Sequence, residues 1–111
     1  AIRKLAENPC IILGRCASDI LRDQPNVFNI YVCADKEDRI HRVMILRALP
    51  YEEAKKALEE ADARRADYYY RNTGKAWGDV NDYHMILDTS RLGVENCAGI
   101  LMQYFERMNY I

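Results

Sequence analysis

Basic and aromatic side chains are concentrated between residues 61 and 77, in the sequence ADARRADYYYRNTGKAW. If this segment is helical, Arg64, Tyr68 and Arg71 lie on one face, because they are spaced four and then three residues apart. Arg65 begins an adjacent stripe on the same helix. Guanidinium groups bind phosphate oxygens in a bidentate manner, and nearby tyrosines can stack on a base or hydrogen-bond to a sugar. The segment therefore predicts a surface for a phosphorylated ligand.

A structural interpretation of the same segment stays open. Asp67 and Arg71 are spaced for an i, i+4 ion pair, and Asp62 and Arg65 for an i, i+3 pair. Both pairs are typical of an ordinary exposed helix. They leave Arg64 and the run of three tyrosines without a structural reason, so phosphate binding remains the favoured hypothesis.

A second set of polar residues follows the apolar runs of the chain. Gly14 and Arg15 come after the first run, Asp35 after the second, and the sequence DTS at positions 88–90 closes the third. Ligands of open parallel sheets bind beyond the carboxyl ends of the strands, so these groups are expected at one edge. Asp35 also suits a helix cap, whereas Arg15, directly after a buried strand, needs an anion or another partner.

Several kinds of catalytic and metal site are excluded by spacing. The two histidines, His41 and His84, form no catalytic pattern, and we expect the first to face solvent and the second to be structural. The sequence contains no HExxH, GxSxG or GxxxxGK[ST] motif. It contains no CxxC pair either, so we predict no metal site and expect reduced, buried thiols at Cys10, Cys16, Cys33 and Cys97.

Three short apolar runs predict the strands that position these groups: residues 10–13, 29–34 and 84–88. They hardly alternate between apolar and polar residues, which indicates strands covered on both faces, as in parallel sheets. Helical patterns precede, separate and follow them. The chain therefore reads as a single α/β domain with parallel strands.

The helical patterns differ in the strength of their apolar stripes. A helix capped by Asp35 has a short stripe, and a helix that begins after Pro50 has a thin one that suits a lightly packed, mobile segment over residues 50–78. The clearest stripe is expected to lie in the core. It consists of Val94, Cys97, Ala98, Leu101, Met102, Phe105 and Met108.

Composition limits the partners of this domain. The 111 residues carry a formal net charge of −1, whereas nucleic-acid-binding domains are usually basic, so we expect no nucleic-acid partner. The sequence contains no apolar run of the roughly 20 residues that a membrane-spanning helix needs, and no signal peptide. We therefore predict a cytoplasmic protein without a membrane partner.

Four stretches together resemble the cytidylate kinase-like proteins, which are relatives of the nucleoside monophosphate kinases. They are CIILGRCASDIL, ADKEDRIHRVM, LPYEEAKKALEEADARRADYYYRNTGKAW and YHMILDTSRLGVENC. The resemblance extends over essentially the whole chain. It implies a three-layer α/β/α fold with a parallel sheet of the P-loop kinase type, and a lid-like helix and loop over residues 50–78.

The resemblance also implies a reaction and roles for particular residues. ATP with Mg²⁺ would donate a phosphoryl group to a nucleoside monophosphate or a similar small phosphorylated molecule. The implied catalytic residues are Arg64 and Arg65, and Arg42 would lie on the side of the donor nucleotide. The residues implied to bind the acceptor are Arg15, Asp19, Tyr68 and Arg71.

The chain departs from the family pattern in two ways. Cys16 stands where the cytidylate kinases have an acidic residue, and they lack the YYYRNTGKAW pattern, so the acceptor is left open. The first strand and the phosphate-binding loop would lie before Ala1, where a helical pattern is already in progress. We therefore expect the C-terminal portion of a kinase-like domain, inactive alone, whose missing part is an N-terminal half or is replaced by a homo-oligomeric partner.

Two other functions stay open beside the kinase. The chain could be a non-catalytic module that binds a nucleotide or anion. Alternatively, the three tyrosines at 68–70 and Trp77 could pack on a second subunit, which would make the chain a protein-interaction domain.

Overall fold

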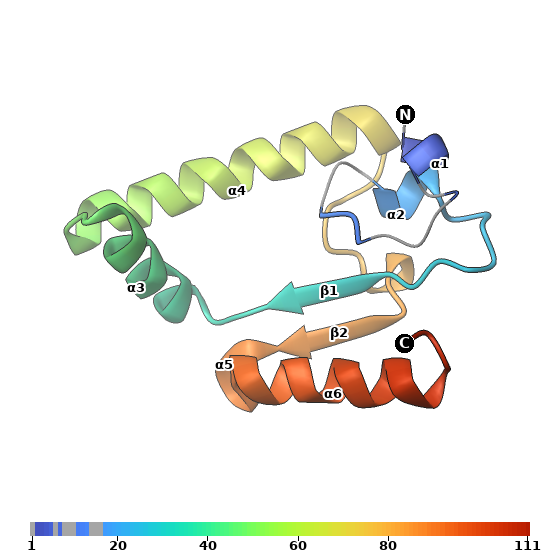
Figure 1. The fold of residues 1–111 in the computed structure, drawn as a ribbon. Helices are drawn as coiled ribbons and strands as arrows, with labels where there is room; N and C mark the ends of the chain where they lie inside the picture. The colour runs from blue at the N-terminus through green and yellow to red at the C-terminus, as the bar shows by residue number, and fades with distance from the viewer. Residues whose placement is uncertain (1, 6, 8–10, 14–16) are drawn as a thin grey trace. The chain divides into compact units, whose positions relative to one another are not determined.

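The computed structural model describes residues 2–5, 7, 11–13 and 17–111, and for Leu5 and Ala17 it describes only the backbone. The described residues form mainly helices (Figure 1). In chain order the elements are α1 (Ile2–Leu5), α2 (Ala17–Ile20), β1 (Ile30–Cys33), α3 (Lys36–Arg47), α4 (Tyr51–Thr73), the 3₁₀ helix η1 (Val80–Asp82), β2 (Met85–Asp88), α5 (Thr89–Leu92) and α6 (Val94–Arg107).

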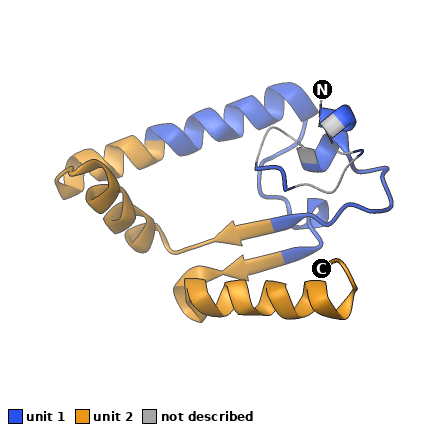
Figure 2. Cartoon of the chain, in the orientation of Figure 1, with its two compact units in different colours: residues 1–30, 60–85 blue, residues 31–59, 86–111 orange. Residues whose placement is uncertain are grey.

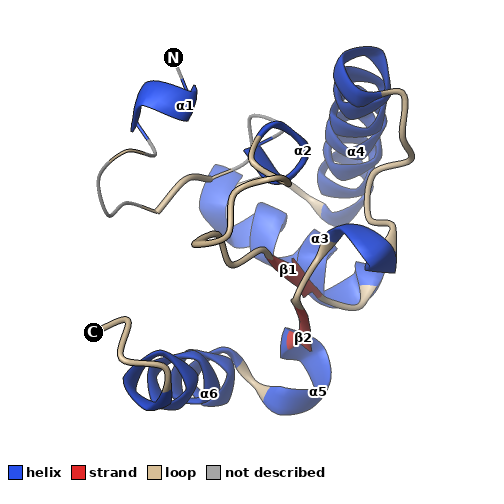
Figure 3. Cartoon of the chain, turned by 90° about the vertical axis from the view of Figure 1, so that its right-hand side faces the viewer, coloured by secondary structure: helices blue, strands red, loops and turns tan. Residues whose placement is uncertain are grey.

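The two strands β1 and β2 pair with each other in a two-stranded sheet. Their arrows point in the same direction in Figure 1, so the sheet is parallel, and Figure 3 shows the same two strands in red. A parallel pair needs a long crossover connection, and here that connection contains α3 and α4. The predicted strands at 29–34 and 84–88 are thus confirmed, and the helix-rich α/β arrangement fits part of an α/β domain.

The predicted strand at 10–13 is wrong for the part that the structure describes. Residues 11–13 have no regular secondary structure, and Ile11 and Leu13 are 89% and 86% exposed. Cys10 lies outside the described residues. A β-branched run forms a strand only where another strand completes its hydrogen bonds, and propensity alone does not supply that partner.

The expectation of strands covered on both faces is also wrong for the described residues. Leu87 in β2 is buried, but its neighbour Ile86 is 40% exposed, and Val32 in β1 is 57% exposed. Successive side chains of a strand point to opposite faces, so burial of one residue leaves the next on the other side. The described part of the chain covers one face of the sheet better than the other.

The chain divides into two compact units, coloured separately in Figure 2. Unit 1 contains residues 1–30 and 60–85, and unit 2 contains residues 31–59 and 86–111. Each unit buries its own apolar residues, so each is described by itself below.

The core of unit 2 lies where α3 meets the first half of α4. Ile40, Ala54 and Leu58 are buried there, with Val43, Met44, Leu49 and Tyr51 packed against them. The two helices are separated because Ala48 takes a left-handed conformation, with φ 51° and ψ 49°, and Pro50 precedes the first turn of α4. The predicted stripe of α3 and the predicted start after Pro50 are confirmed.

The apolar stripe of α6 is less buried than predicted. Cys97 is 5% exposed, but Val94, Met102 and Met108 are 59%, 50% and 46% exposed. The helical period was recognised correctly, since α6 spans Val94–Arg107. The expected core is nevertheless wrong for most of the stripe, because the described residues cover only its centre.

Unit 1 is held by fewer apolar residues. Leu21 and Tyr69 are 4% and 6% exposed. Gly74 ends α4 with a φ of +71°, a conformation that favours glycine, and its N–H donates to the Tyr70 carbonyl. The chain then turns into η1, where the Asp79 carboxylate accepts from the Asn81 N–H at 2.9 Å. This turn returns the chain toward the start of β2.

Candidate functional site

The predicted arginine-bearing surface lies on the second half of α4, within unit 1. Arg64, Arg65, Tyr68 and Arg71 are all exposed on this helix. Their spacing over two turns places Arg64 and Arg71 about 10 Å apart along the helix axis. The helix therefore presents several guanidinium groups to solvent, as the sequence predicted.

Two of these arginines also form the predicted ion pairs. Arg65 Nη1 lies 3.3 Å from Asp62 Oδ1, and Arg71 Nε lies 2.9 Å from Asp67 Oδ2. Arg64 forms no ion pair with any residue that the structure describes. The structural interpretation thus accounts for two of the three arginines, and Arg64 is the one that lacks such a pair among the described residues.

The three consecutive tyrosines differ in burial. Tyr69 is 6% exposed, whereas Tyr68 and Tyr70 are 52% and 63% exposed. Successive helical residues are rotated by about 100°, so one of three can face inward while its neighbours stay in solvent. Burial is the main reason why the pKa of the Tyr69 phenol is raised. Tyr69 therefore anchors the helix, whereas the Tyr68 side chain lies largely in solvent.

The Tyr69 hydroxyl reaches two polar groups from other parts of unit 1. It lies 3.4 Å from Ser18 Oγ and 3.4 Å from Asp82 Oδ2, to which it donates. These long hydrogen bonds connect α4 to the segments around α2 and η1. The same three segments line a pocket.

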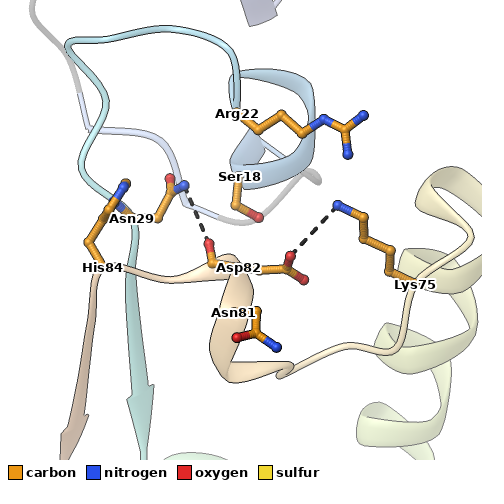
Figure 4. A pocket seen from close by; sticks show the side chains of 7 residues that line it. All are labelled: Ser18, Arg22, Asn29, Lys75, Asn81, Asp82 and His84. Atoms are coloured by element: carbon orange, nitrogen blue, oxygen red, sulfur yellow. Dashed lines mark hydrogen bonds and ion pairs between the residues drawn. The ribbon is translucent and has the colours of Figure 1, made fainter.

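This pocket has a volume of about 270 Å³ and is lined entirely by polar side chains (Figure 4). All of them belong to unit 1. They are Ser18, Arg22, Asn29, Lys75, Asn81, Asp82 and His84. None of them was a predicted site residue.

Lys75 is the central charge of this pocket. Its ammonium lies 2.8 Å from Asp19 Oδ1, which is buried, and 3.7 Å from Asp82 Oδ1. The hydrogen bond to Asp19 raises the pKa of Lys75, so the side chain stays charged at neutral pH. Asp19 also lies 3.8 Å from Arg22. The predicted acceptor-binding residue Asp19 is thus not among the residues that line the pocket, but it pairs with one of them, Lys75.

The imidazole of His84 is fixed on one edge and one face. Its Nδ1 accepts a hydrogen bond of 2.7 Å from the Asn29 N–H, and its ring stacks on Phe28 at 5.4 Å between centroids. Because Nδ1 is the acceptor, the proton of the neutral ring belongs on Nε2. The expectation of a structural His84 is consistent with these contacts. The exposed His41 instead bonds the Glu37 carbonyl at 2.7 Å.

The strand ends form a separate cluster within unit 2. The Asp35 N–H donates to Ser90 Oγ at 2.7 Å, and Thr89 Oγ1 donates to the Cys33 carbonyl at 3.2 Å. The predicted convergence of these residues at one edge is confirmed. Gly14 and Arg15, predicted to join them, lie outside the described residues, as does Cys16.

Carboxylates in this cluster have structural partners. Arg91 pairs with Asp88 and lies 3.8 Å from Asp35, and the pKa of Asp88 is lowered chiefly by its hydrogen bond to Arg91. Asp88 also accepts from the N–H groups of Ser90 and Arg91. Asp35 occupies the N-cap position of α3, but its side chain makes no capping bond, so that detail of the prediction is wrong. The Arg91 guanidinium competes for that carboxylate.

Arg42, predicted on the donor side, is not among the residues that line the pocket. Arg42 is exposed on α3, in unit 2. Among the described residues no group of three His, Cys, Asp or Glu side chains converges to hold a metal. Asp19 and Asp82 are already bridged by an ammonium, so the described side chains do not fit an Mg²⁺ site. The thiols of Cys33 and Cys97 are free, and only Cys97 is fully buried.

Sequence reasoning missed Lys75, Arg22, Asn29 and Asp82. A lysine directly after a glycine, in a loop that ends a cationic helix, was a usable signal for Lys75. The other three come from loops and short helices, where no periodicity marks the side that faces a ligand. Only the fold brings these segments together.

The described fold fits part of an α/β domain with a small parallel sheet. The profile of the cytidylate kinase-like family matches residues 1–91. The chain belongs to this family, which confirms the resemblance. In the part of the chain that the structure describes, every helix is too short or too polar to cross a membrane.

Similarity to a solved structure extends over most of the chain. The chain resembles the crystal structure of an uncharacterized protein from Eubacterium ventriosum ATCC 27560, with 27% sequence identity and a TM-score of 0.88. The match covers 96% of this chain but 61% of that one. No curated protein matches the chain.

Proposed function

We propose that this chain supplies acceptor-site and lid arginines for ATP-dependent phosphoryl transfer to a nucleoside monophosphate or a similar acceptor. One observation carries the proposal: a member of the cytidylate kinase-like family exposes Arg64, Arg65 and Arg71 on one helix. In the proposed complete domain, the parallel sheet is the centre of a three-layer α/β/α fold of the P-loop kinase type. Residues 50–78 form its lid.

The arginines suit this reaction because phosphoryl transfer depends mainly on positioning and charge neutralisation. Exposed i, i+3 and i, i+4 ion pairs contribute only about 0.3–0.5 kcal/mol. A phosphate offers charge-assisted, bidentate hydrogen bonds that are roughly twice as strong as neutral ones. Arg65 and Arg71 can therefore exchange their aspartate partners for a phosphoryl group, and Arg64 needs no exchange.

The other predicted residues take roles around this centre. Arg15 holds the acceptor phosphate, Tyr68 contacts the acceptor, and Arg42 lies on the donor side. Asp19 acts on the acceptor through Lys75, which it orients. Mg²⁺ needs few protein ligands when nucleotide phosphates supply oxygens, so it enters this proposal only as a companion of ATP.

The test is ADP release by the protein as its gene encodes it, with ATP, MgCl₂ and each nucleoside monophosphate in turn. Turnover with at least one acceptor is expected, and Arg64→Gln should lower kcat/KM by about 100-fold or more, in the manner of arginines that stabilise transferring phosphoryl groups. Arg107→Gln on α6 is the matched control, since it removes an exposed arginine elsewhere. Absence of ADP release with every acceptor would refute the kinase.

A second candidate is a nucleotide-binding module without turnover. It is favoured by the absence of a GxxxxGK[ST] sequence from these 111 residues. Titration calorimetry separates the candidates: a monophosphate that binds to a protein unable to release ADP supports the module. The 111-residue chain by itself is expected to show no turnover.

A further inference from the structure

The pairing of β1 and β2 begins with an irregular step at Asn29 and His84, the residues just before the two strands. The Asn29 carbonyl accepts from the His84 N–H at 2.8 Å and from the Met85 N–H at 3.2 Å. In a regular parallel ladder the Asn29 N–H would donate two residues further back, to the Asp82 carbonyl. It donates instead to His84 Nδ1 at 2.7 Å, and only the Asn29 side-chain amide reaches the Asp82 carbonyl, at 3.5 Å (Figure 4). An imidazole nitrogen thus takes the place of a backbone acceptor.

This hydrogen bond requires a neutral ring. An imidazole nitrogen accepts only while it carries no proton, and both nitrogens of the charged ring are donors. After protonation, the new proton on His84 Nδ1 would point at the Asn29 N–H. The N–H must then turn to the Asp82 carbonyl, its regular ladder acceptor, or to water. The step therefore has two discrete arrangements, and the charge of one side chain selects between them.

Other groups around the ring act on its charge in opposite directions. The charged side chains that share the pocket with His84, or pair with those that do, are Arg22, Lys75, Asp19 and Asp82. Two of them are cations, which disfavour a charged imidazole, and two are carboxylates, which favour it. The ring also stacks on Phe28, a contact that is open to its neutral and its charged form. The bond from Asn29 is the contact that only one form can make.

We infer that His84 is a pH-sensitive latch on the start of the β1–β2 pairing: the neutral ring holds the Asn29 N–H, and protonation releases it. The direction follows from proton uptake. The folded chain keeps this hydrogen bond above the range in which imidazoles titrate, at about pH 6.5, and loses it as pH falls through that range. The latch needs no nucleotide, so it does not depend on the proposed function.

His41, the second of the two histidines, is an internal control with the opposite polarity. Its Nδ1 lies 2.7 Å from the Glu37 carbonyl, which can only accept, so this nitrogen carries the proton of the neutral ring. Protonation of His41 adds a proton at Nε2 and leaves the bond to Glu37 intact. The two exposed histidines should therefore have opposite neutral tautomers, and only His84 should couple its charge to a backbone hydrogen bond.

The test is nuclear magnetic resonance of the ¹⁵N-labelled protein, as its gene encodes it, from about pH 5 to 7.5, the range in which histidine changes charge. The ring nitrogen shifts should place the neutral proton on Nε2 of His84 and on Nδ1 of His41. The Asn29 amide signal should follow the titration of His84. Its protection from hydrogen exchange, corrected for the intrinsic rate, should fall about threefold to tenfold on protonation, the effect of one lost hydrogen bond.

A pair of substitutions separates the latch from other effects of pH. His84→Asn removes the titration but keeps an acceptor, because the asparagine oxygen branches from the same side-chain carbon position as Nδ1 of histidine. In this variant the Asn29 amide should stay protected across the pH range. His41→Asn is the matched control and should leave the pH response of Asn29 as it is in the wild type.

Three results would overturn the inference: a proton on Nδ1 of neutral His84, an Asn29 amide that does not follow the titration of His84, or a pH response of Asn29 that persists in His84→Asn. The first two are measured on the wild-type protein, so they decide the question even if a variant does not fold.

Discussion

Three adjacent tyrosines with different burial give the sharpest test of the structure. Replacing Tyr69 with alanine removes a ring that is 94% buried, since its exposed fraction is 6%. Tyr68 and Tyr70 provide matched controls of the same chemistry on the same helix, and they are 52% and 63% exposed. Only the central substitution should destabilise unit 1 strongly.

The size of the effect follows from the buried area. An aromatic side chain buries about 150–250 Å², which at about 25 cal/mol per Å² corresponds to roughly 4–6 kcal/mol. That figure is an upper bound, and measured truncations of buried aromatics cost about 3–5 kcal/mol. The two hydrogen bonds of the hydroxyl are long, at 3.4 Å each, so Tyr69→Phe should cost less than about 1 kcal/mol. The ring therefore dominates and the hydroxyl contributes little.

Urea unfolding followed by circular dichroism measures these free energies, and hydrogen exchange assigns the loss to peptides from residues 60–85. Tyr68→Ala and Tyr70→Ala should stay within about 1 kcal/mol of the wild type, because half-exposed rings lose less and alanine favours the helix. Equal destabilisation by all three substitutions would show that α4 does not bury Tyr69 selectively. A large loss of stability in Tyr69→Phe would show that the hydroxyl, and not the ring, provides most of the stabilisation.

Alkaline pH provides an independent check on Tyr69. Its pKa is raised in the folded state, so its contribution to stability is complete below the ordinary tyrosine value near 10 and is lost as pH rises through the folded value. Tyr69→Phe should remove one late-titrating phenol from the ultraviolet titration of the folded protein. An unchanged late phase would assign that phenol elsewhere.

Three further substitutions test other parts of the structure. Ile40→Ala removes a fully buried side chain from the core of unit 2 and should cost about 2–5 kcal/mol in urea unfolding; a cost below 1 kcal/mol would contradict that core. Asp88→Asn should lower the melting temperature at pH 7 but not at a pH below the lowered pKa of Asp88. The carboxylate stabilises the fold above the ordinary aspartate pKa near 4, and this effect is lost as pH falls through the pKa of the folded state. An equal loss at both pH values would refute the Arg91 pairing. Lys75→Gln should lower the melting temperature by leaving the Asp19 carboxylate without its close cation, and the added change Asp19→Asn should restore part of the loss; additive losses would show that the pair is not coupled.

Local sequence patterns predicted those elements whose interactions lie close along the chain. The helical period of residues 94–107, the start of α4 after Pro50 and both exposed ion pairs were predictable for this reason. The strand expected at residues 10–13 was wrong for residues 11–13, since a strand depends on a partner that local sequence does not specify. The exposed stripe of α6 was misjudged in the same way, because a pattern shows which face is apolar but not what covers it.

The residues of the candidate site also differ in how well local sequence patterns predicted their placement. Arg64 and Arg71 could be placed on a common face by counting residues, whereas the burial of Tyr69 was not predicted. Lys75 and Asp82 could not be connected with Asp19, which lies more than fifty positions earlier in the chain. Contacts between loops at such separations depend on the whole path of the backbone, and no local pattern encodes them.

The exposed arginines of α4 and the Asp19–Lys75–Asp82 group, both in unit 1, differ in how tightly their cations are held. The exposed arginines of α4 are held by weak, exchangeable ion pairs, so a phosphate can take them without a large cost. The Asp19–Lys75–Asp82 group has one ammonium between two carboxylates and lies beside a buried tyrosine, so its net negative charge resists an incoming anion. The two groups therefore differ in how readily a phosphate can replace the carboxylates beside their cations.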